Sequence, residues 1–388
     1  MKIGVLTFHR AINYGAVLQA YSLVEKLKTE FPEDVVEIVD YNCKAREFYN
    51  LKCPIVFFLR RSPREAIQKI IQTRTFKKFA KRLPLSKSFC GSKESKVEKY
   101  ISRTYDILIV GSDAVFNWGD LGLPNIYFAD NITGVHKLTY AASAHLQKYE
   151  ETTVEEKAFL NEALSKFEYV GVRDAGSERF VNFFCEKKCF HNCDPTVFLP
   201  MNFPKDSLKE KLKKHNFDFN KKSVFVMLMR RGISKMVRQK FGDDVQIVAL
   251  MDANEEADVY LYDLNPFEWG HVFSYADFVV TDYFHATMLS LKNGTPVMSV
   301  DSSRYCEKNY ESKAYDLLHT RLGMPELYIN INEFKDEQSA NNVFNERVDR
   351  ILNTFDKMKV QERLLQEAEH SSSFLEALKI IHSNKERG

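Results

Sequence analysis

Apolar positions recur in two patterns along this 388-residue chain. Short continuous apolar runs, of the length of a buried strand, alternate with longer stretches whose apolar residues recur every three or four positions, as on one face of a helix. This alternation predicts βαβ units, and therefore parallel sheets covered by helices. The expected strands are 2–7, 35–40, 105–110, 136–142, 167–172 and 188–192 in the first half, and 223–229, 245–250, 278–280 and 296–300 in the second.

The stretch 276–301 shows this alternation most clearly. An apolar strand ends in Thr281 and Asp282, which are helix-starting residues, and the short helix that follows stops at Asn293-Gly294 before a second strand. His285 therefore falls in the first turn of the helix, where free backbone N–H groups favour an anion and a neutral imidazole. A neutral imidazole beside an anion suits proton transfer, but a histidine that only caps or packs the turn fits the pattern as well.

Polar residues also follow other predicted strands, where α/β folds place their ligands. Arginine is suited to a bidentate grip on carboxylate or phosphate, and a lysine at a helix amino end is unfavourable unless an anion compensates it. Each position has an ordinary reading too: a turn, a helix cap, an arginine paired with Asp174 or Glu178, or a solvated lysine. The candidates are Asn13, Tyr14, Gly15, Gly111, Ser112, Asp113, Arg173 and Lys313.

The length and the order of elements predict two domains. We expect an N-terminal α/β domain over 1–199 with a basic helical insert at about 52–100, and a lysine-rich linker over 200–222. A C-terminal α/β domain should cover 223–345, followed by helices over 346–388 that could pack back on the first domain. Two such domains place their strand ends across one cleft, so a ligand is expected between them.

The net charge of +2 hides a strongly basic segment between Lys52 and Lys87, in which Glu65 is the only acid. An apolar run at 55–59 and a helical apolar stripe accompany the positive charge. Such a basic amphipathic segment is typical of docking on an anionic membrane surface, and equally of a solvated helix face. Nucleic acid is not expected as a partner, because no recognisable binding motif accompanies the charge. The predicted stripe consists of Ile67, Ile70, Ile71 and Phe76.

The remaining composition limits where the protein is expected in the cell and whether it is expected to bind a metal. No apolar run reaches the roughly 18 residues of a membrane helix, and the first apolar run is too short for a signal peptide, so a cytoplasmic location is expected, peripheral to the membrane at most. Cys185, Cys189 and Cys193, with His191 between them, do not have the spacing of a zinc site. We therefore expect neither a metal nor a cofactor.

Several motifs together resemble the polysaccharide pyruvyltransferase family over roughly residues 1–330. The resemblance implies two Rossmann-like α/β domains facing a cleft, as in the glycosyltransferases called GT-B. It also implies that phosphoenolpyruvate is the co-substrate, and that its enolpyruvyl carbons are transferred to a sugar as a ketal. The motifs are 2–7 through 13–20, Gly111-Ser112-Asp113, 171–174, 194–196, 282–287 around His285, and Lys313 five residues before Leu318.

The resemblance also implies roles for individual residues. His285 would be the general acid or base, and Arg173, Lys313, Thr281, Asp282 and Thr287 would meet the donor. Asn13, Tyr14, Gly15, Gly111, Ser112, Asp113, Tyr283 and Arg230 would line the acceptor side or the cleft. Several family members have arginine at the position of Tyr283, and many have glycine at that of Ala286. Arg173, Arg230 and Arg231 are candidates to compensate for the first departure.

The acceptor implied by the resemblance is a sugar of a bacterial surface polysaccharide, capsular or exopolysaccharide, on a lipid-diphosphate carrier. The basic segment agrees with such a membrane-resident acceptor. Two alternatives remain open from the sequence. The same fold could host a glycosyltransferase that uses a nucleotide sugar, or the chain could be a non-catalytic glycan-binding protein.

Overall fold

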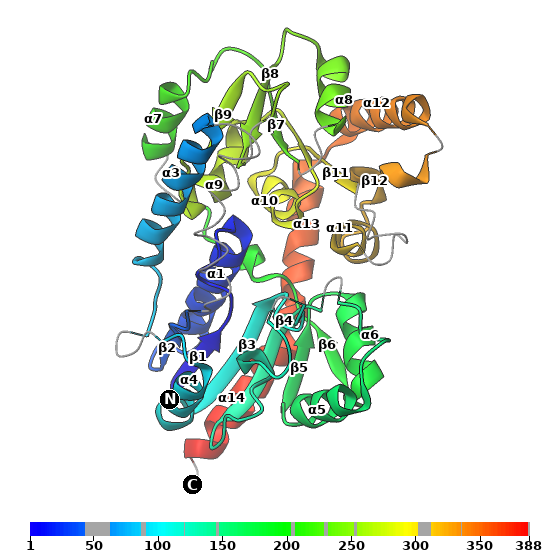
Figure 1. Ribbon diagram of the computed structural model, residues 1–388. Helices are drawn as coiled ribbons and strands as arrows, with labels where there is room; N and C mark the ends of the chain where they lie inside the picture. The colour runs from blue at the N-terminus through cyan, green and yellow to red at the C-terminus, as the bar shows by residue number, and fades with distance from the viewer. Residues whose placement is uncertain are drawn as a thin grey trace. The chain divides into compact units, whose positions relative to one another are not determined.

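The computed structural model describes residues 1–42, 63–86, 91–119, 121–144, 147–202, 206–228, 232–251, 254–301, 312–334 and 336–386 (Figure 1). The chain forms two compact units, each built around its own six-stranded sheet. Unit 1 contains the described residues of 1–52, 78–199 and 368–388, and unit 2 contains those of 53–77 and 200–367. The predicted organisation into two parallel-sheet α/β domains is therefore confirmed.

The sheet of unit 1 has the strand order β2-β1-β3-β4-β5-β6, and every neighbouring pair is parallel. Each expected strand of the first half is present. β3 runs to Asp113, three residues beyond the prediction, because its pairing with β4 continues to Asp113 and Ala142. The strands are β1 Lys2–Leu6, β2 Val35–Ile38, β3 Ile107–Asp113, β4 His136–Ala142, β5 Tyr169–Val172 and β6 Cys189–His191.

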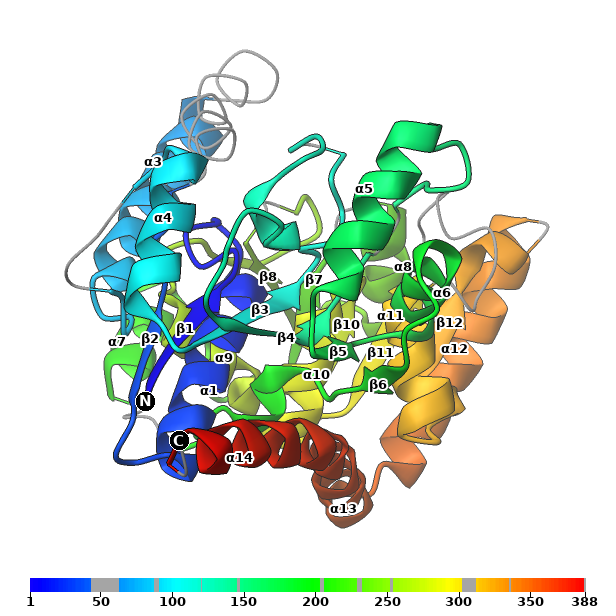
Figure 2. The same cartoon turned by 90° about the horizontal axis from the view of Figure 1, so that it is seen from below.

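Helices cover both faces of this sheet. Figure 2 shows α1 and α14 on one side of the sheet and α4, α5 and α6 on the other. The parallel strands are therefore buried on both faces, which explains why they read as continuous apolar runs. The helices of unit 1 are α1 Tyr14–Glu30, α4 Glu94–Thr104, α5 Val154–Ser165, α6 Ala175–Phe184 and α14 Ser372–Glu386, with 3-10 turns η1 Ile126–Phe128, η2 Pro195–Phe198 and η8 Glu369–Ser371.

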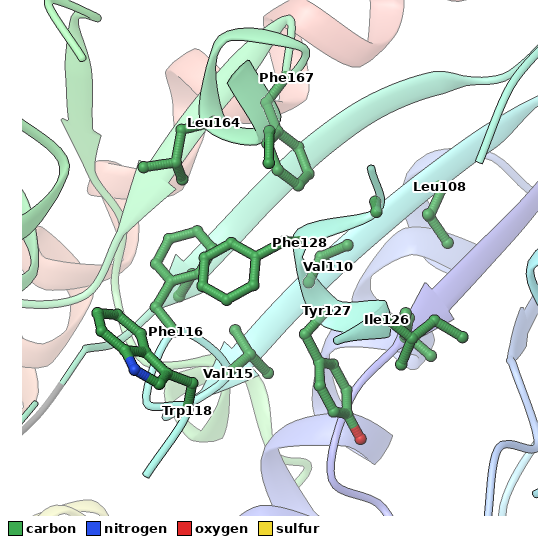
Figure 3. Packing of buried hydrophobic residues seen from close by; sticks show 14 of the residues in the cluster. Leu108, Val110, Val115, Phe116, Trp118, Ile126, Tyr127, Phe128, Leu164 and Phe167 are labelled. Atoms are coloured by element: carbon green, nitrogen blue, oxygen red, sulfur yellow. The ribbon is translucent and has the colours of Figure 1, made fainter. Parts of the chain in front are cut away.

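An aromatic core lies between one face of this sheet and its helices. Phe116 stacks on Phe128 with ring centroids 5.6 Å apart, and Trp118 contacts Phe128 as well (Figure 3). Phe180 packs against both Phe116, at 5.7 Å, and Trp118. Phe116 and Trp118 follow β3 directly in the chain. Their burial therefore anchors the segment after β3, next to the predicted Gly111-Ser112-Asp113 turn.

The sheet of unit 2 has the order β12-β11-β10-β7-β8-β9 and is also parallel throughout. Its outer strands, β9 and β12, were not predicted. Each has only three residues, too few to show a strand pattern in the sequence. The strands are β7 Ser223–Met227, β8 Gln246–Leu250, β9 Val259–Leu261, β10 Phe278–Thr281, β11 Val297–Asp301 and β12 Tyr328–Asn330.

The helices of unit 2 include α7 Asp206–Lys214, which lies inside the predicted linker over 200–222. The high lysine content suggested a linker, but Leu208 and Leu212, four residues apart, are both fully buried. The other helices are α3 Pro63–Ala80 as far as residue 77, α8 Gly232–Phe241, α9 Pro266–Val272, α10 Phe284–Asn293, α11 Lys313–Tyr315, the π-helix η5 Asp316–Arg321, α12 Glu337–Thr354 and α13 Lys357–Ala368, with 3-10 turns η3 Phe273–Tyr275, η6 Pro325–Leu327 and η7 Ile331–Glu333.

Two segments differ from the expected domain boundaries. The described part of the basic insert divides, because residues 63–77 of α3 belong to unit 2 whereas α4 belongs to unit 1. The C-terminal helices divide as well: α12 and α13 belong to unit 2, and α14 packs on unit 1. Phe374 of α14 contacts the rings of Tyr140 and Tyr169, and Asn192 donates a hydrogen bond to the carbonyl of His370.

None of the helices in the described ranges combines the length and the apolar character that crossing a bilayer requires.

A polar cluster attaches α7 to the segment between β9 and α9. His215 lies 2.9 Å and the Lys214 ammonium 3.2 Å from the Asp263 carboxylate. Burial alone would raise the pKa of Asp263, but hydrogen bonding and charge from His215, Lys211 and Lys214 outweigh it and lower the pKa to about 2. A lowered pKa means that the ionised carboxylate stabilises the fold above pH 4, and that this contribution is lost as the pH falls toward 2.

We expect Asp263→Asn to lower the free energy of unfolding by roughly 2 kcal/mol at pH 7, because it removes this ionised partner. The difference between variant and wild type should shrink as the pH approaches 2, which urea unfolding at both pH values would measure. Asp349→Asn, at a carboxylate that is 59% exposed, is the control and should change little at either pH. Equal stability of Asp263→Asn and wild type at pH 7 would contradict the prediction.

Candidate active site

In unit 1 the predicted polar residues gather at the carboxyl edge of the sheet, because all strands are parallel. Hydrogen bonds connect neighbouring loops along this edge. The Thr7 hydroxyl donates to the Ser112 carbonyl at 2.9 Å, and the Ser143 amide donates to the Asp113 carbonyl at 2.9 Å. The Ser143 hydroxyl in turn donates to the Asp174 carboxylate at 2.8 Å. The end of β3 and the turns after β1, β4 and β5 are therefore joined by one hydrogen-bonded network.

The last three residues of β3, Gly111 to Asp113, have an unusual backbone conformation. Gly111 has φ +122°, and a Cβ there would lie 2.3 Å from the Tyr140 carbonyl oxygen, so only glycine fits. Asp113 has φ +88°, an unfavourable conformation for a residue other than glycine. Ser112 is fully buried, whereas Asp113 is only half-buried. Gly111 and Ser112 thus shape the end of β3, and Asp113 carries the half-buried carboxylate there.

At the start of α1, the three predicted residues differ in exposure. Asn13 is exposed and caps the helix, its side-chain oxygen accepting a hydrogen bond from the Ala16 amide at 3.2 Å. Tyr14 is 1% exposed and Gly15 is buried as well. Only Asn13 of the three offers a side chain to the surface of unit 1.

Arg173 lies inside unit 1, with 3% of its surface exposed. Its guanidinium donates to the Asp194 carboxylate at 3.1 Å and to the Gln19 side-chain oxygen at 3.2 Å. The ordinary partners expected from the sequence were Asp174 or Glu178, but Asp174 instead caps α6 by accepting from Ser177. Arg173 thus connects α1 with the ends of β5 and β6.

In unit 2 the turn between β10 and α10 is built by buried threonines. The Thr281 hydroxyl donates to the Met227 carbonyl at 2.8 Å and accepts from the Tyr283 amide at 3.0 Å. The Thr287 hydroxyl lies 3.1 Å from that of Ser299 on β11. Both threonines are 0% exposed. Their hydroxyls are engaged within the fold, so they position the turn, which differs from the predicted contact with a donor.

This turn has four half-buried side chains, those of Asp282, Tyr283, Phe284 and His285, although the Nε2 atom of His285 is itself buried. Tyr283 is the N-cap of α10; its own side chain makes no capping bond, and its amide donates to the Thr281 hydroxyl. α11 contacts α10 and begins at the half-buried Lys313 (Figure 1). Within one unit, the structure brings an imidazole, a helix amino end and the helix that carries a lysine into proximity.

The described candidates therefore form two groups in different units. Unit 1 holds Asn13, Tyr14, Gly15, Gly111, Ser112, Asp113 and Arg173, and unit 2 holds Thr281, Asp282, Tyr283, His285, Thr287 and Lys313. Arg230, predicted to line the site, and Arg231 lie outside the described residues, as do residues 52–62 and 87 of the basic segment.

Among the described residues, no group of three or more His, Cys, Asp or Glu side chains is arranged to hold a metal ion. Cys185, Cys189 and Cys193 are free cysteines. Burial, together with the nearby charge of Glu178, raises the pKa of Cys189 to about 12. This thiol is therefore protonated at neutral pH and is a poor nucleophile.

A further polar cluster in unit 1 was missed by the sequence analysis. Arg10 donates two hydrogen bonds to the Asp40 carboxylate, at 2.7 and 2.8 Å, and the His9 ring lies 3.2 Å from the same carboxylate. His9 and Asp40 are buried, while Arg10 is 34% exposed. The available signal was their position, since these residues follow or end the first two predicted strands. Their separation in sequence concealed the pairing.

The model of the polysaccharide pyruvyl transferase family matches residues 13–304, which is more than half of the chain and includes parts of both units. The chain belongs to this family. The match confirms the resemblance seen in the sequence motifs. The matched range includes the turn at His285 in this pyruvyl transferase family member, but ends before Lys313. A search of curated proteins found no match.

Solved structures similar to this pyruvyl transferase family member include the UDP-bound MnaA of S. aureus (TM-score 0.53, 12% identity, covering 97% of this chain and 96% of that one). The UDP-GlcNAc 2-epimerase of Methanocaldococcus jannaschii has a TM-score of 0.52 at 11% identity, covering 94% and 99%. That of Rickettsia bellii has a TM-score of 0.50 at 9% identity, covering 98% and 97%. At these identities the similarity concerns the fold alone, and it agrees with the predicted GT-B-like class.

Proposed function

We propose that this member of the pyruvyl transferase family moves the enolpyruvyl group of phosphoenolpyruvate onto two hydroxyls of a sugar, forming a ketal. The acceptor is a lipid-linked intermediate of a bacterial capsular or exopolysaccharide. One observation carries the proposal: His285 lies in the first turn of α10, beside the helix that begins with Lys313, in a chain of this family.

The charge of the donor matches the chemistry of this turn. Phosphoenolpyruvate carries a carboxylate and a phosphate, and both are stabilised by cations and by backbone N–H groups at a helix amino end. The first turn of α10 supplies the N–H groups, and Lys313 supplies the positive charge. Tyr283 supplies a phenol hydroxyl where several family members have arginine. We therefore assign donor binding to the α10 end and Lys313.

The reaction needs two proton movements. Carbon 3 of the donor gains a proton to become the methyl group, and carbon 2 forms bonds to the two sugar oxygens. The bond between carbon 2 and the phosphate oxygen breaks, so phosphate leaves. The two hydroxyl protons balance the proton gained by carbon 3 and the proton taken by the phosphate. We assign to His285 one of these transfers, either donation to carbon 3 or removal from a hydroxyl.

In unit 1, Asp113 and Asn13 are our candidates for contact with the acceptor, because they are the reachable members of the predicted set. Tyr14, Gly15, Gly111 and Ser112 are buried and would act by shaping those turns. Arg173 was expected to hold the donor. Its burial and its partners, Asp194 and Gln19, favour a positioning role at the edge of the sheet.

The decisive experiment is an assay of phosphate release from phosphoenolpyruvate against a panel of lipid-linked sugars. Thermal stabilisation by phosphoenolpyruvate and by a uridine nucleotide should be measured in parallel, because the UDP-bound structural relative makes the nucleotide the relevant competitor. We expect phosphate release with at least one acceptor and stabilisation by phosphoenolpyruvate. Stabilisation by the nucleotide alone would favour a glycosyltransferase. Absence of turnover with every acceptor would favour a glycan-binding protein.

Lys313→Ala should raise the KM for phosphoenolpyruvate about 10- to 100-fold, because it removes a charge-assisted contact to the donor. The effect on kcat should be smaller, and Lys313→Arg should recover part of the loss. Steady-state kinetics at saturating acceptor would measure both constants. Lys359→Ala, at an exposed lysine of α13, is the matched control and should behave like wild type. An unchanged donor KM in Lys313→Ala would exclude Lys313 from the donor site.

A further inference from the structure

Helix α3 divides its residues between two faces in a way that the sequence did not predict. A helix turns about 100° per residue, so positions 67, 70, 74, 77 and 78 share one side. Ile67 is 57% and Ile70 38% exposed, whereas Phe76, expected in the same stripe, is 5% exposed on the opposite side. Gln68, Gln72 and Phe79 accompany Phe76 on the buried face. The outward face of α3 therefore presents two bare isoleucines.

Basic residues surround these isoleucines. Arg64, Arg74, Lys77 and Lys78 are exposed on α3, and Lys81 and Arg82 follow the helix directly. Glu65 is the only acidic residue of the helix. Within the parts of the chain that the structure describes, none of these six cations forms an ion pair with a carboxylate. The positive charge is therefore available to an external partner. We call this surface, with its two isoleucines, the α3 face.

We propose that the α3 face docks on an anionic lipid bilayer. The isoleucines would enter the boundary between headgroups and acyl chains, while the arginines and lysines would lie among anionic headgroups. The combination of aliphatic and cationic side chains on one face distinguishes this partner from nucleic acid. Single strands are usually held by aromatic stacking, but Phe76 and Phe79 are on the buried side of α3. The apolar side chains of the isoleucines would make no stabilising contact with the phosphate backbone of a nucleic acid.

Docking would bring the protein to the surface where a lipid-linked acceptor resides. This link to catalysis rests on the proposed function. The docking itself rests only on the composition and exposure of α3, so the two can be tested separately.

Flotation of the full-length protein with phosphatidylcholine vesicles, with and without phosphatidylglycerol, tests the docking. We expect the protein to float with the anionic vesicles only, and to be released as salt is added. Each basic residue near an anionic surface contributes a factor of about five to binding, so Arg74→Glu/Lys77→Glu, which removes two positive charges and adds two negative ones, should weaken it more than about 25-fold. Ile67→Asn/Ile70→Asn should weaken it about tenfold or more without changing its salt dependence.

Helix α13 offers matched controls, because it also exposes cations and apolar side chains, with the exposed acid Glu362 among them. Lys359→Glu/Arg363→Glu and Met358→Asn/Leu365→Asn should float like wild type; Met358 is 78% and Leu365 70% exposed. The proposal would be overturned if wild-type protein remained in the soluble fraction when the anionic vesicles float. So would α3 variants that float as well as wild type, or equally salt-sensitive binding to single-stranded RNA with no vesicle binding.

A second readout separates docking from catalysis. The α3 variants should keep wild-type phosphate release with a water-soluble acceptor, and lose it with the same sugar anchored in anionic vesicles. Flotation without any turnover would support the docking while the proposed function fails. Turnover without flotation would support the proposed function and overturn the docking.

Discussion

His285→Ala should yield a folded protein whose phosphate release from phosphoenolpyruvate is about 10²- to 10⁴-fold slower than that of wild type. The reason is that a positioned general acid or base typically contributes a factor of this size. His285 is half-buried in the first turn of α10, and alanine is a good helix former, so the fold should tolerate the change. Single-turnover phosphate release, with circular dichroism as a check on folding, would measure the effect.

His136→Ala is the control for this variant. His136 is 47% exposed at the amino end of β4, the opposite end of that strand from the candidate site of unit 1, and its ring lies 2.9 Å from Glu168. We expect wild-type turnover from it. Near-normal turnover of His285→Ala would mean that His285 only packs or caps the turn, and the acid or base would have to be sought elsewhere.

Arg173→Ala should lower the free energy of unfolding by about 3–5 kcal/mol, because it leaves the Asp194 carboxylate buried without its cation. Gln19 would lose the donor to its side-chain oxygen in the same change. Urea unfolding at neutral pH would measure the loss. Arg173→Met/Asp194→Leu should be markedly more stable than Arg173→Ala alone, since it removes both charges.

This prediction also separates the two roles considered for Arg173. A positioning role predicts a loss of stability with a donor KM close to wild type, measured at a temperature where the variant remains folded. Wild-type stability combined with a large increase in the KM for phosphoenolpyruvate would show instead that the guanidinium meets the donor.

Much of the fold could be read from the chain because its parallel strands are covered on both faces. Such strands appear as uninterrupted apolar runs, and ten of the twelve were expected close to their observed positions. β9 and β12 are too short for a pattern. α7 was read as linker because lysines outnumber its two buried leucines. Domain membership was harder to predict, since the assignment of residues 63–77 to unit 2 depends on contacts distant in sequence.

For the candidate site, the sequence could indicate positions but not exposure or partners. Parallel topology places residues after strands at one edge, so Asp113 and His285 could be selected by position alone. Thr281 and Thr287 are fully buried whereas Asp282 is half-buried, and the sequence contains no signal for that difference. Arg173 pairs with Asp194, which lies 21 residues further along the chain. Nearer acidic residues were the more obvious partners, but they are engaged elsewhere.

The position of α14 has a consequence for synthesis of the protein. Phe374 and Leu378 of this helix are each 1% exposed, and they cover a face of a sheet whose strands all lie within the first 191 residues. A ribosome therefore makes all of unit 2 before it makes the helix that completes unit 1. α1 already covers the part of that face at β2 and β3, but until translation ends the part at β4 and β5 lacks α14, so the first unit to emerge is the last to be finished.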